Sequence, residues 1–80
     1  MEAYILTITI CYARQQYDIM VNPESKIHEV LSVLSERNMI PSLDELETDI
    51  FSERQQKSIS MECTFKEGHI YQGDKLHMIQ

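Results

Sequence analysis

The sequence contains few of the residues that mark several large classes of protein. Its 80 residues include two glycines, two prolines, two cysteines and no tryptophan. So little glycine and proline excludes collagen-like and linker-like chains. Basic residues are also scarce, because seven of them stand against 13 acidic residues and give a net charge of −6. Binding to nucleic acid through neutralisation of its phosphates is therefore not expected.

Long hydrophobic runs are absent as well. The most apolar stretch, Tyr4 to Tyr12, is about half the length of a membrane span and is interrupted by threonines. Glu2 precedes it where a signal peptide has basic residues, and no small-residue cleavage site follows. Cys11 and Cys63 form no C-x-x-C motif, and such cysteines in a chain without a signal peptide are usually free thiols. We expect a cytoplasmic protein with no direct membrane insertion.

What is present is typical of one globular domain covering residues 1–80. Hydrophobic residues make up 42% of the chain and charged residues 25%, close to the average for folded domains. Apolar and polar residues alternate over residues 4–12 and 17–21, which predicts two strands. The polar segment 13–16 between them predicts an antiparallel hairpin, whose turn type the sequence leaves open.

An amphipathic helix follows the hairpin. Ile27, Val30, Leu31 and Leu34 have the spacing i, i+3, i+4 and i+7, which predicts a helix of about three turns with one apolar face. Ser25 is expected to be its N-cap. Asn38 is expected to end the helix in the left-handed conformation.

The second half of the chain contains short elements. Capping-box patterns at residues 42–45 and 64–67 predict two helical turns, the first near residues 43–47, and Gly68 is expected to end the second. Gly73 supplies a positive φ to the turn before the final strand. Two short strands are predicted around residues 50–51 and 59–61, and a final strand is predicted over residues 75–79, stopping at Gln80.

This order of elements predicts an α+β fold. The helix has to lie across one face of the sheet, because neither element can bury its apolar face alone. The first and last strands are expected to pair in parallel at the centre of a mixed sheet of four or five strands. That arrangement is the β-grasp.

The sequence resembles ubiquitin along most of its length. Residues 21–27 (Val-Asn-Pro-Glu-Ser-Lys-Ile) are similar to the strand-to-helix connection of ubiquitin, and Ile40-Pro41 is similar to its post-helix segment. Residues 64–79 are similar to its last turn and final strand. Residues 42–58 depart from ubiquitin, being longer and more acidic. The resemblance implies the ubiquitin-like β-grasp fold.

Ubiquitin-like modifiers and sulfur-carrier proteins act through a flexible tail that ends in Gly-Gly. This sequence ends at Gln80 and has no glycine pair there. We therefore disfavour modifier or sulfur-carrier activity, which stays the alternative function and would require a longer precursor.

A closer resemblance is to the YukD and EsaB family of bacterial ubiquitin-like proteins, which is associated with type VII (ESX-like) secretion. It rests on Tyr17-Asp18-Ile19 in the second strand and on Gly73-Asp74-Lys75-Leu76-His77-Met78 before and within the last strand. The resemblance implies a non-catalytic adaptor or regulatory protein. Its partners would be other proteins, including membrane-bound secretion machinery.

The residues themselves show no arrangement that is typical of an enzyme. The three histidines have no H-E-x-x-H spacing, and Cys11 and Cys63 have no basic neighbour in sequence to lower the pKa of a thiol. The acidic run within residues 44–53 lacks the spacing and glycine of a calcium loop. We expect no catalytic residues, no cofactor and no metal ion.

We expect partner proteins to bind the sheet face opposite the helix, which is the face that ubiquitin uses. Ile50 and Phe51 are neighbours in one strand, so only one of them faces outward. Self-association as a homodimer, through this face or through an open strand edge, is a further alternative. The candidate residues are Ile5, Met20, Ile50, Phe51, His77 and Ile79.

Overall fold

The computed structural model describes residues 5–41, 43 and 49–78. Within those residues it contains five strands and one helix, in the order that the sequence predicts. The elements are β1 (Leu6–Tyr12), β2 (Gln15–Val21), α1 (Ile27–Glu36), β3 (Asp49–Ser52), β4 (Lys57–Ser60) and β5 (Lys75–Met78).

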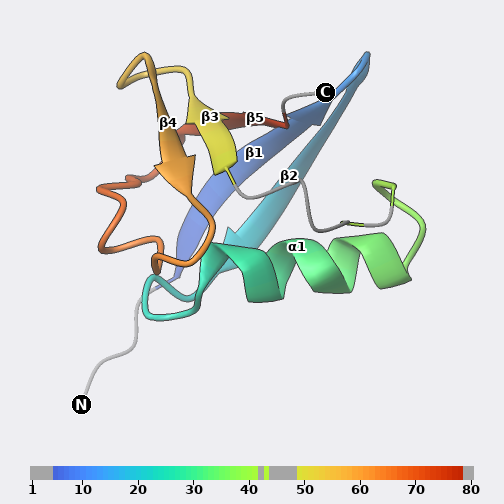
Figure 1. Ribbon diagram of the computed structural model, residues 1–80, viewed down its shortest axis with the longest axis horizontal. Coiled ribbons are helices and arrows are strands. Elements are labelled where there is room, and N and C mark those ends of the chain that lie inside the picture. Colours follow the sequence, from blue (N-terminus) through green and yellow to red (C-terminus); the bar gives the residue numbers. More distant parts are fainter. Residues whose placement is uncertain (1–4, 42, 44–48, 79–80) are drawn as a thin grey trace.

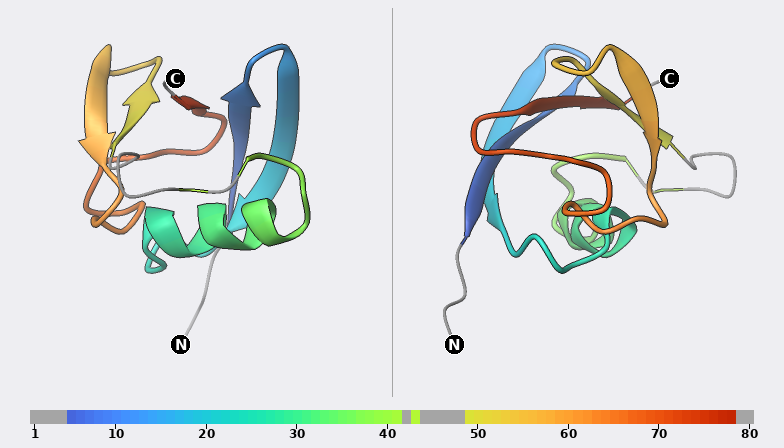
Figure 2. Two further views of the ribbon diagram at one scale, coloured as in Figure 1. Left: turned by 45° about the vertical axis from the view of Figure 1, so that its right-hand side comes forward. Right: turned by 90° about the vertical axis from the view of Figure 1, so that its left-hand side faces the viewer.

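The strands form one mixed sheet with the order β2-β1-β5-β3-β4. β1 and β5 pair in parallel at its centre, and the other neighbours are antiparallel. Helix α1 lies across one face of the sheet (Figure 1). The right-hand view of Figure 2 looks nearly along α1 and shows the sheet curving around it. The predicted α+β class and β-grasp arrangement are confirmed.

The core lies between α1 and the sheet, because alternate residues of each strand point to the same face. Ile8 and Ile10 of β1 and Leu76 of β5 are fully buried there. From α1, Ile27 and Leu31 pack into the same cluster, as the helical spacing predicts.

The β1–β2 turn is tighter than the predicted polar segment. Gln15 and Gln16 belong to β2, so the loop contains only Ala13 and Arg14. Ala13 has a φ of 54° and is the one positive-φ residue of this loop, which fits a type II′ turn. Two-residue loops of this type match the twist of the paired strands.

The start of α1 corrects the expected cap. Lys26, not Ser25, occupies the N-cap position, and no side chain caps the helix there. Two of the helix's first backbone N–H groups, those of Ile27 and His28, instead donate to the carbonyls of Cys63 and Met61, each at 3.0 Å. Carbonyls from a distant segment therefore satisfy N–H groups that a capping side chain usually satisfies.

The end of α1 confirms the role predicted for Asn38. Its φ is 62°, its N–H donates to the Ser35 carbonyl at 3.0 Å, and the Met39 N–H donates to the Leu34 carbonyl at 3.0 Å. This is the Schellman motif, in which asparagine is tolerated in place of glycine. The helical turn predicted near residues 43–47 depends on residues that lie outside the described ones.

The second capping box is confirmed. The Glu67 N–H donates to Thr64 Oγ1, and the Thr64 N–H donates to Glu67 Oε1, both at 3.0 Å. The end of this turn differs from the expectation, because His69 and not Gly68 has the positive φ, at 58°. Gly68 has a different role, since a Cβ atom there would lie 2.8 Å from Cγ2 of Ile59.

A buried carboxylate stands at the entrance to β5. Asp74 is 5% exposed, and its Oδ1 and Oδ2 accept hydrogen bonds from Nε and Nη2 of Arg54 at 2.8 and 3.1 Å. Oδ2 also accepts the Tyr71 N–H at 2.9 Å. Arg54 Nη2 donates to the carbonyl of His69, and its guanidinium stacks 4.5 Å from the centre of the Tyr71 ring. The hydrogen bond to Asp74 raises the pKa of Arg54 above its already high ordinary value.

Among the described residues, no helix combines the length and the apolar character needed to cross a membrane.

We expect Gly68→Ala to destabilise the fold by about 1–3 kcal/mol, because the new methyl group overlaps Cγ2 of Ile59. Urea denaturation measures the loss. Ile59→Ala removes Cγ2 and should relieve much of the penalty in the double variant, whereas Ile59→Val retains that atom and should not. If Gly68→Ala cost the same free energy of unfolding in the wild type and in the Ile59→Ala variant, this explanation would be contradicted.

We expect Arg54→Ala to lower the melting temperature by several degrees, because it leaves the buried Asp74 carboxylate without its charged partner. Lys66→Ala is the matched control. It breaks an ion pair with Glu24 whose side chains are 68% and 70% exposed and 3.6 Å apart, so its effect should be small. Thermal unfolding followed by circular dichroism measures both, and equal shifts would show that burial of Asp74 does not matter.

Candidate protein-binding face

The sheet has a second face, turned away from α1, which we call the outer face. Strand alternation and the pairing register assign its residues, because the opposite parity supplies the core. The residues with outward parity include Thr7, Thr9 and Cys11 on β1, Asp18 and Met20 on β2, Phe51 on β3, Ser58 on β4, and Lys75 and His77 on β5.

An aromatic pair lies near the middle of the outer face. Phe51 and His77 are direct partners between β3 and β5. Their ring centroids are 6.5 Å apart and the ring planes are inclined by 57°. This tilted arrangement falls within the geometry that aromatic pairs prefer. The pairing of β5 with β3 therefore brings together two candidates that are 26 residues apart in sequence.

Glu53 joins this pair. Its Oε1 lies 2.7 Å from Nε2 of His77, and its backbone N–H donates to the Lys75 carbonyl at 3.1 Å. The sequence did not indicate Glu53, because it follows β3 in a turn where strand alternation no longer assigns a face. We call Phe51, His77 and Glu53 the Phe51–His77 cluster.

Ile50 was a wrong candidate. Its side chain is completely buried in the core, whereas the next residue, Phe51, is partly exposed on the outer face. Register decides between them, since Ile50 pairs with the buried Met78 and Phe51 pairs with His77. Ile79 lies outside the described residues.

Ile5 and Met20 are exposed, at 49% and 75%, but they do not join the cluster. On β1, Thr7 pairs with Met20 and Cys11 pairs with His77, so the two pairs are four residues apart along this strand. That separation is about 13 Å along β1. The expected single patch is therefore two separate sets of residues.

Cys11 lies on the outer face by parity, next to His77, yet it is only 6% exposed. Burial raises the pKa of its thiol, and the nearby positive charge of Lys75 offsets this only in part. A raised pKa lowers the fraction of reactive thiolate at neutral pH. No group of three or more histidine, cysteine or acidic side chains is placed to hold a metal ion in the described part of the chain.

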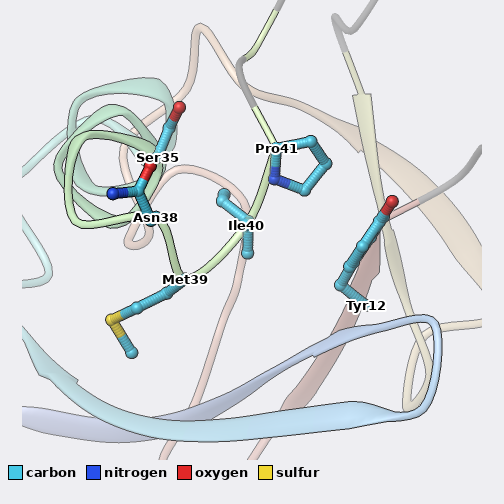
Figure 3. A pocket seen from close by; sticks show the side chains of 6 residues that line it. All are labelled: Tyr12, Ser35, Asn38, Met39, Ile40 and Pro41. Carbon is cyan, nitrogen blue, oxygen red and sulfur yellow. The ribbon is translucent and has the colours of Figure 1, made fainter.

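A shallow pocket of about 350 Å³ lies away from this face, between the end of α1 and the end of β1. Figure 3 shows Met39 and Ile40 from the post-helix loop, with Tyr12 across from them. No sequence pattern indicated this pocket. Among the described residues its lining contains no acidic or basic side chain and consists of Tyr12, Ser35, Asn38, Met39, Ile40 and Pro41.

Comparison with solved structures identifies the fold. The N-terminal ubiquitin-like domain of the 4931431F19Rik protein matches with a TM-score of 0.71 and 9% identity, over 98% of this chain and 76% of that one. Ubiquitin from Caldiarchaeum subterraneum matches with a TM-score of 0.68 and 15% identity, over 96% of each chain. The chain has the ubiquitin-like fold.

A bacterial domain is also among the matches. The EccD5 ubiquitin-like domain from Mycobacterium xenopi has a TM-score of 0.57 and 13% identity, over 95% of this chain and 93% of that one. At these identities the likeness to ubiquitin-like proteins shows the fold alone. No protein-family model matches the sequence, and no curated protein matches it.

We expect Cys11 to react with iodoacetamide several-fold more slowly than Cys63 in the native protein, because Cys11 is buried and its thiol has a raised pKa whereas Cys63 is partly exposed. Mass spectrometry of peptides after timed alkylation at pH 8 measures both rates. In 8 M urea the two rates should become similar. Equal rates in the native protein would contradict the described burial.

Proposed function

We propose that this chain is a non-catalytic ubiquitin-like adaptor or regulatory protein, which binds other proteins through the Phe51–His77 cluster of the outer face. The observation that carries the proposal is the partly exposed aromatic pair on a sheet face that α1 does not cover. Aromatic side chains are enriched among residues that dominate binding energy at protein interfaces.

The charged part of the cluster supports recognition of a polar partner. The Glu53 side chain is 51% exposed and the His77 side chain 39% exposed, so both remain open to a partner. A partner that covers Phe51 would meet this pair at its rim, where charged groups contribute to specificity and association rate.

The geometry also supports a binding role over chemistry. Cys11, the register partner of His77 on β1, is buried and has a raised thiol pKa. A base has to lie within hydrogen-bond reach of the nucleophile that it activates, and among the described residues the one side chain found at that distance from the His77 ring is the Glu53 carboxylate.

We place the proposed partners among the components of a bacterial type VII secretion system, with the protein in the cytoplasm. The support is the resemblance of residues 17–19 and 73–78 to the YukD and EsaB family. The likeness to the EccD5 ubiquitin-like domain points in the same direction, as a likeness of fold.

The test is a pull-down of type VII membrane components from membrane extracts of the source cells, using tagged protein. Phe51→Ala should weaken binding by about 5- to 30-fold, the effect of losing one or two kcal/mol at a binding hot spot. Val33→Ala is the matched control, because Val33 is 48% exposed on α1, away from the outer face.

Circular dichroism confirms that each variant is folded. Full binding by a folded Phe51→Ala would contradict the outer-face site. If the wild type captures proteins unrelated to secretion and Phe51→Ala does not, the adaptor role would stand and the assignment to a secretion system would be rejected.

A further inference from the structure

The free edge of β2 offers a second surface, separate from the Phe51–His77 cluster. β2 is the last strand on its side of the sheet, as Figure 1 also shows. On its other side it pairs with β1 over seven residue pairs. The residues of β1 bond alternately to β5 and to β2. The bonds between β1 and the β5 side therefore show which β2 residues direct their backbone groups toward the free edge.

Thr7 and Thr9 direct their backbone groups toward the segment that enters β5. The Thr7 carbonyl accepts the Gly73 N–H at 2.8 Å, and the Thr9 N–H donates to the Asp74 carbonyl at 2.9 Å. Successive residues of a strand direct their backbone groups to opposite sides. Ile8 and Ile10 therefore bond to β2, and their register partners are Ile19 and Tyr17.

Gln16, Asp18 and Met20 consequently direct their N–H and C=O groups away from β1. The two-residue turn agrees, because such a turn is closed by a hydrogen-bonded pair, here Tyr12 and Gln15. Within residues 5–41, 43 and 49–78, no backbone hydrogen bond to these three residues is found across the free edge. The edge thus presents a complete pattern for one more strand.

The side chains of β2 also suit an added strand. Met20 is 75% exposed on the outer face, and Tyr17 and Ile19 are only partly buried on the other. The strand has no proline and no lysine, which are the usual protections of an open edge. The opposite edge strand, β4, is only four residues long and begins with Lys57.

Asp18 is the one charged residue of β2, at the centre of the three edge residues. Thr9 Oγ1 donates a hydrogen bond to its Oδ1 at 2.7 Å, which holds the carboxylate over the outer face. A residue added directly opposite would have its side chain beside this carboxylate, because direct cross-strand partners share a face.

We propose that the β2 edge binds an extended segment of a partner protein as an added antiparallel strand, with lysine or arginine opposite Asp18. Opposite charges in directly facing positions stabilise strand pairs. The chain's net charge of −6 also attracts a basic segment. From N- to C-terminus, the segment carries two apolar residues facing Met20 and Ile19, then the basic residue, then an apolar residue facing Tyr17. This inference does not depend on the outer-face proposal.

A second copy of the chain fits this edge less well. The antiparallel register that uses all three edge residues places Asp18 opposite Asp18 of the other copy. Like charges in directly facing positions destabilise a strand pair. Any other hydrogen-bonded register pairs fewer of the three residues, and each copy carries the same net charge of −6.

The test uses the synthetic peptide Thr-Val-Val-Lys-Val-Thr, with capped ends, and ¹⁵N-labelled protein. We expect the peptide to slow amide hydrogen exchange at Gln16, Asp18 and Met20, since these N–H groups gain acceptors. A peptide with glutamate in place of lysine should bind several-fold more weakly. Asp18→Lys should reverse this preference, which separates the charge effect from any loss of fold.

Phe51→Ala is the control variant and should bind the lysine peptide like the wild type, since Phe51 lies on β3, three strands from the edge. Equal binding of the two peptides, or unchanged exchange at the three edge amides, would overturn the proposal. The proposal would also be overturned if these amides were protected in the absence of peptide and the protection increased with protein concentration. A second copy of the chain would then occupy the edge.

Discussion

The arrangement of the sheet depends on the hydrogen bonds that the residue Asp74 makes with its backbone and its side chain. Its backbone carbonyl accepts the Thr9 N–H and so fixes the start of β5 against β1. Its side chain holds the guanidinium of Arg54, in the turn between β3 and β4. A carboxylate that is 5% exposed costs free energy unless it is paired. Those hydrogen bonds form only when the β3–β4 turn reaches the 69–74 segment, and the backbone carbonyl of the same residue joins that segment to β1, so Asp74 links both halves of the sheet.

Most of the fold follows from local patterns in the sequence. Alternation in β1 and β2, the helical spacing from Ile27 to Leu34, and the reciprocal Thr64–Glu67 cap all specify local structure, and all three are found. The errors occur where a distant segment decides. Ser25 is not the N-cap because carbonyls of Met61 and Cys63 take that role. Gly68 is needed for close approach to Ile59, a contact that no local pattern reveals.

For the candidate site, the sequence predicted only which strand residues share the outer face, because alternation along a strand assigns faces. Parity placed Met20 and His77 on the outer face, and the structure agrees. Parity alone did not decide between Ile50 and Phe51, because the register of a four-residue strand is set by its partners. The sequence also missed Glu53, since the position of a turn residue depends on the closing geometry of the β3–β4 hairpin. Burial of Cys11 was missed for a similar reason, as outward parity does not exclude cover by neighbouring side chains.

Each strand residue has two separate means of making contact, and this chain divides them between two surfaces. A residue's side chain points to a face, whereas its backbone groups point along the sheet to a neighbouring strand. Phe51 and His77 have neighbours on both sides, so only their side chains remain for a partner. Met20 and Asp18 lie on an edge strand, so their backbone groups remain as well. A strand added at β2 would widen the outer face beside Met20 without approaching Phe51. The two proposed partners would therefore not compete for one surface, because one would recognise side chains and the other would extend the sheet.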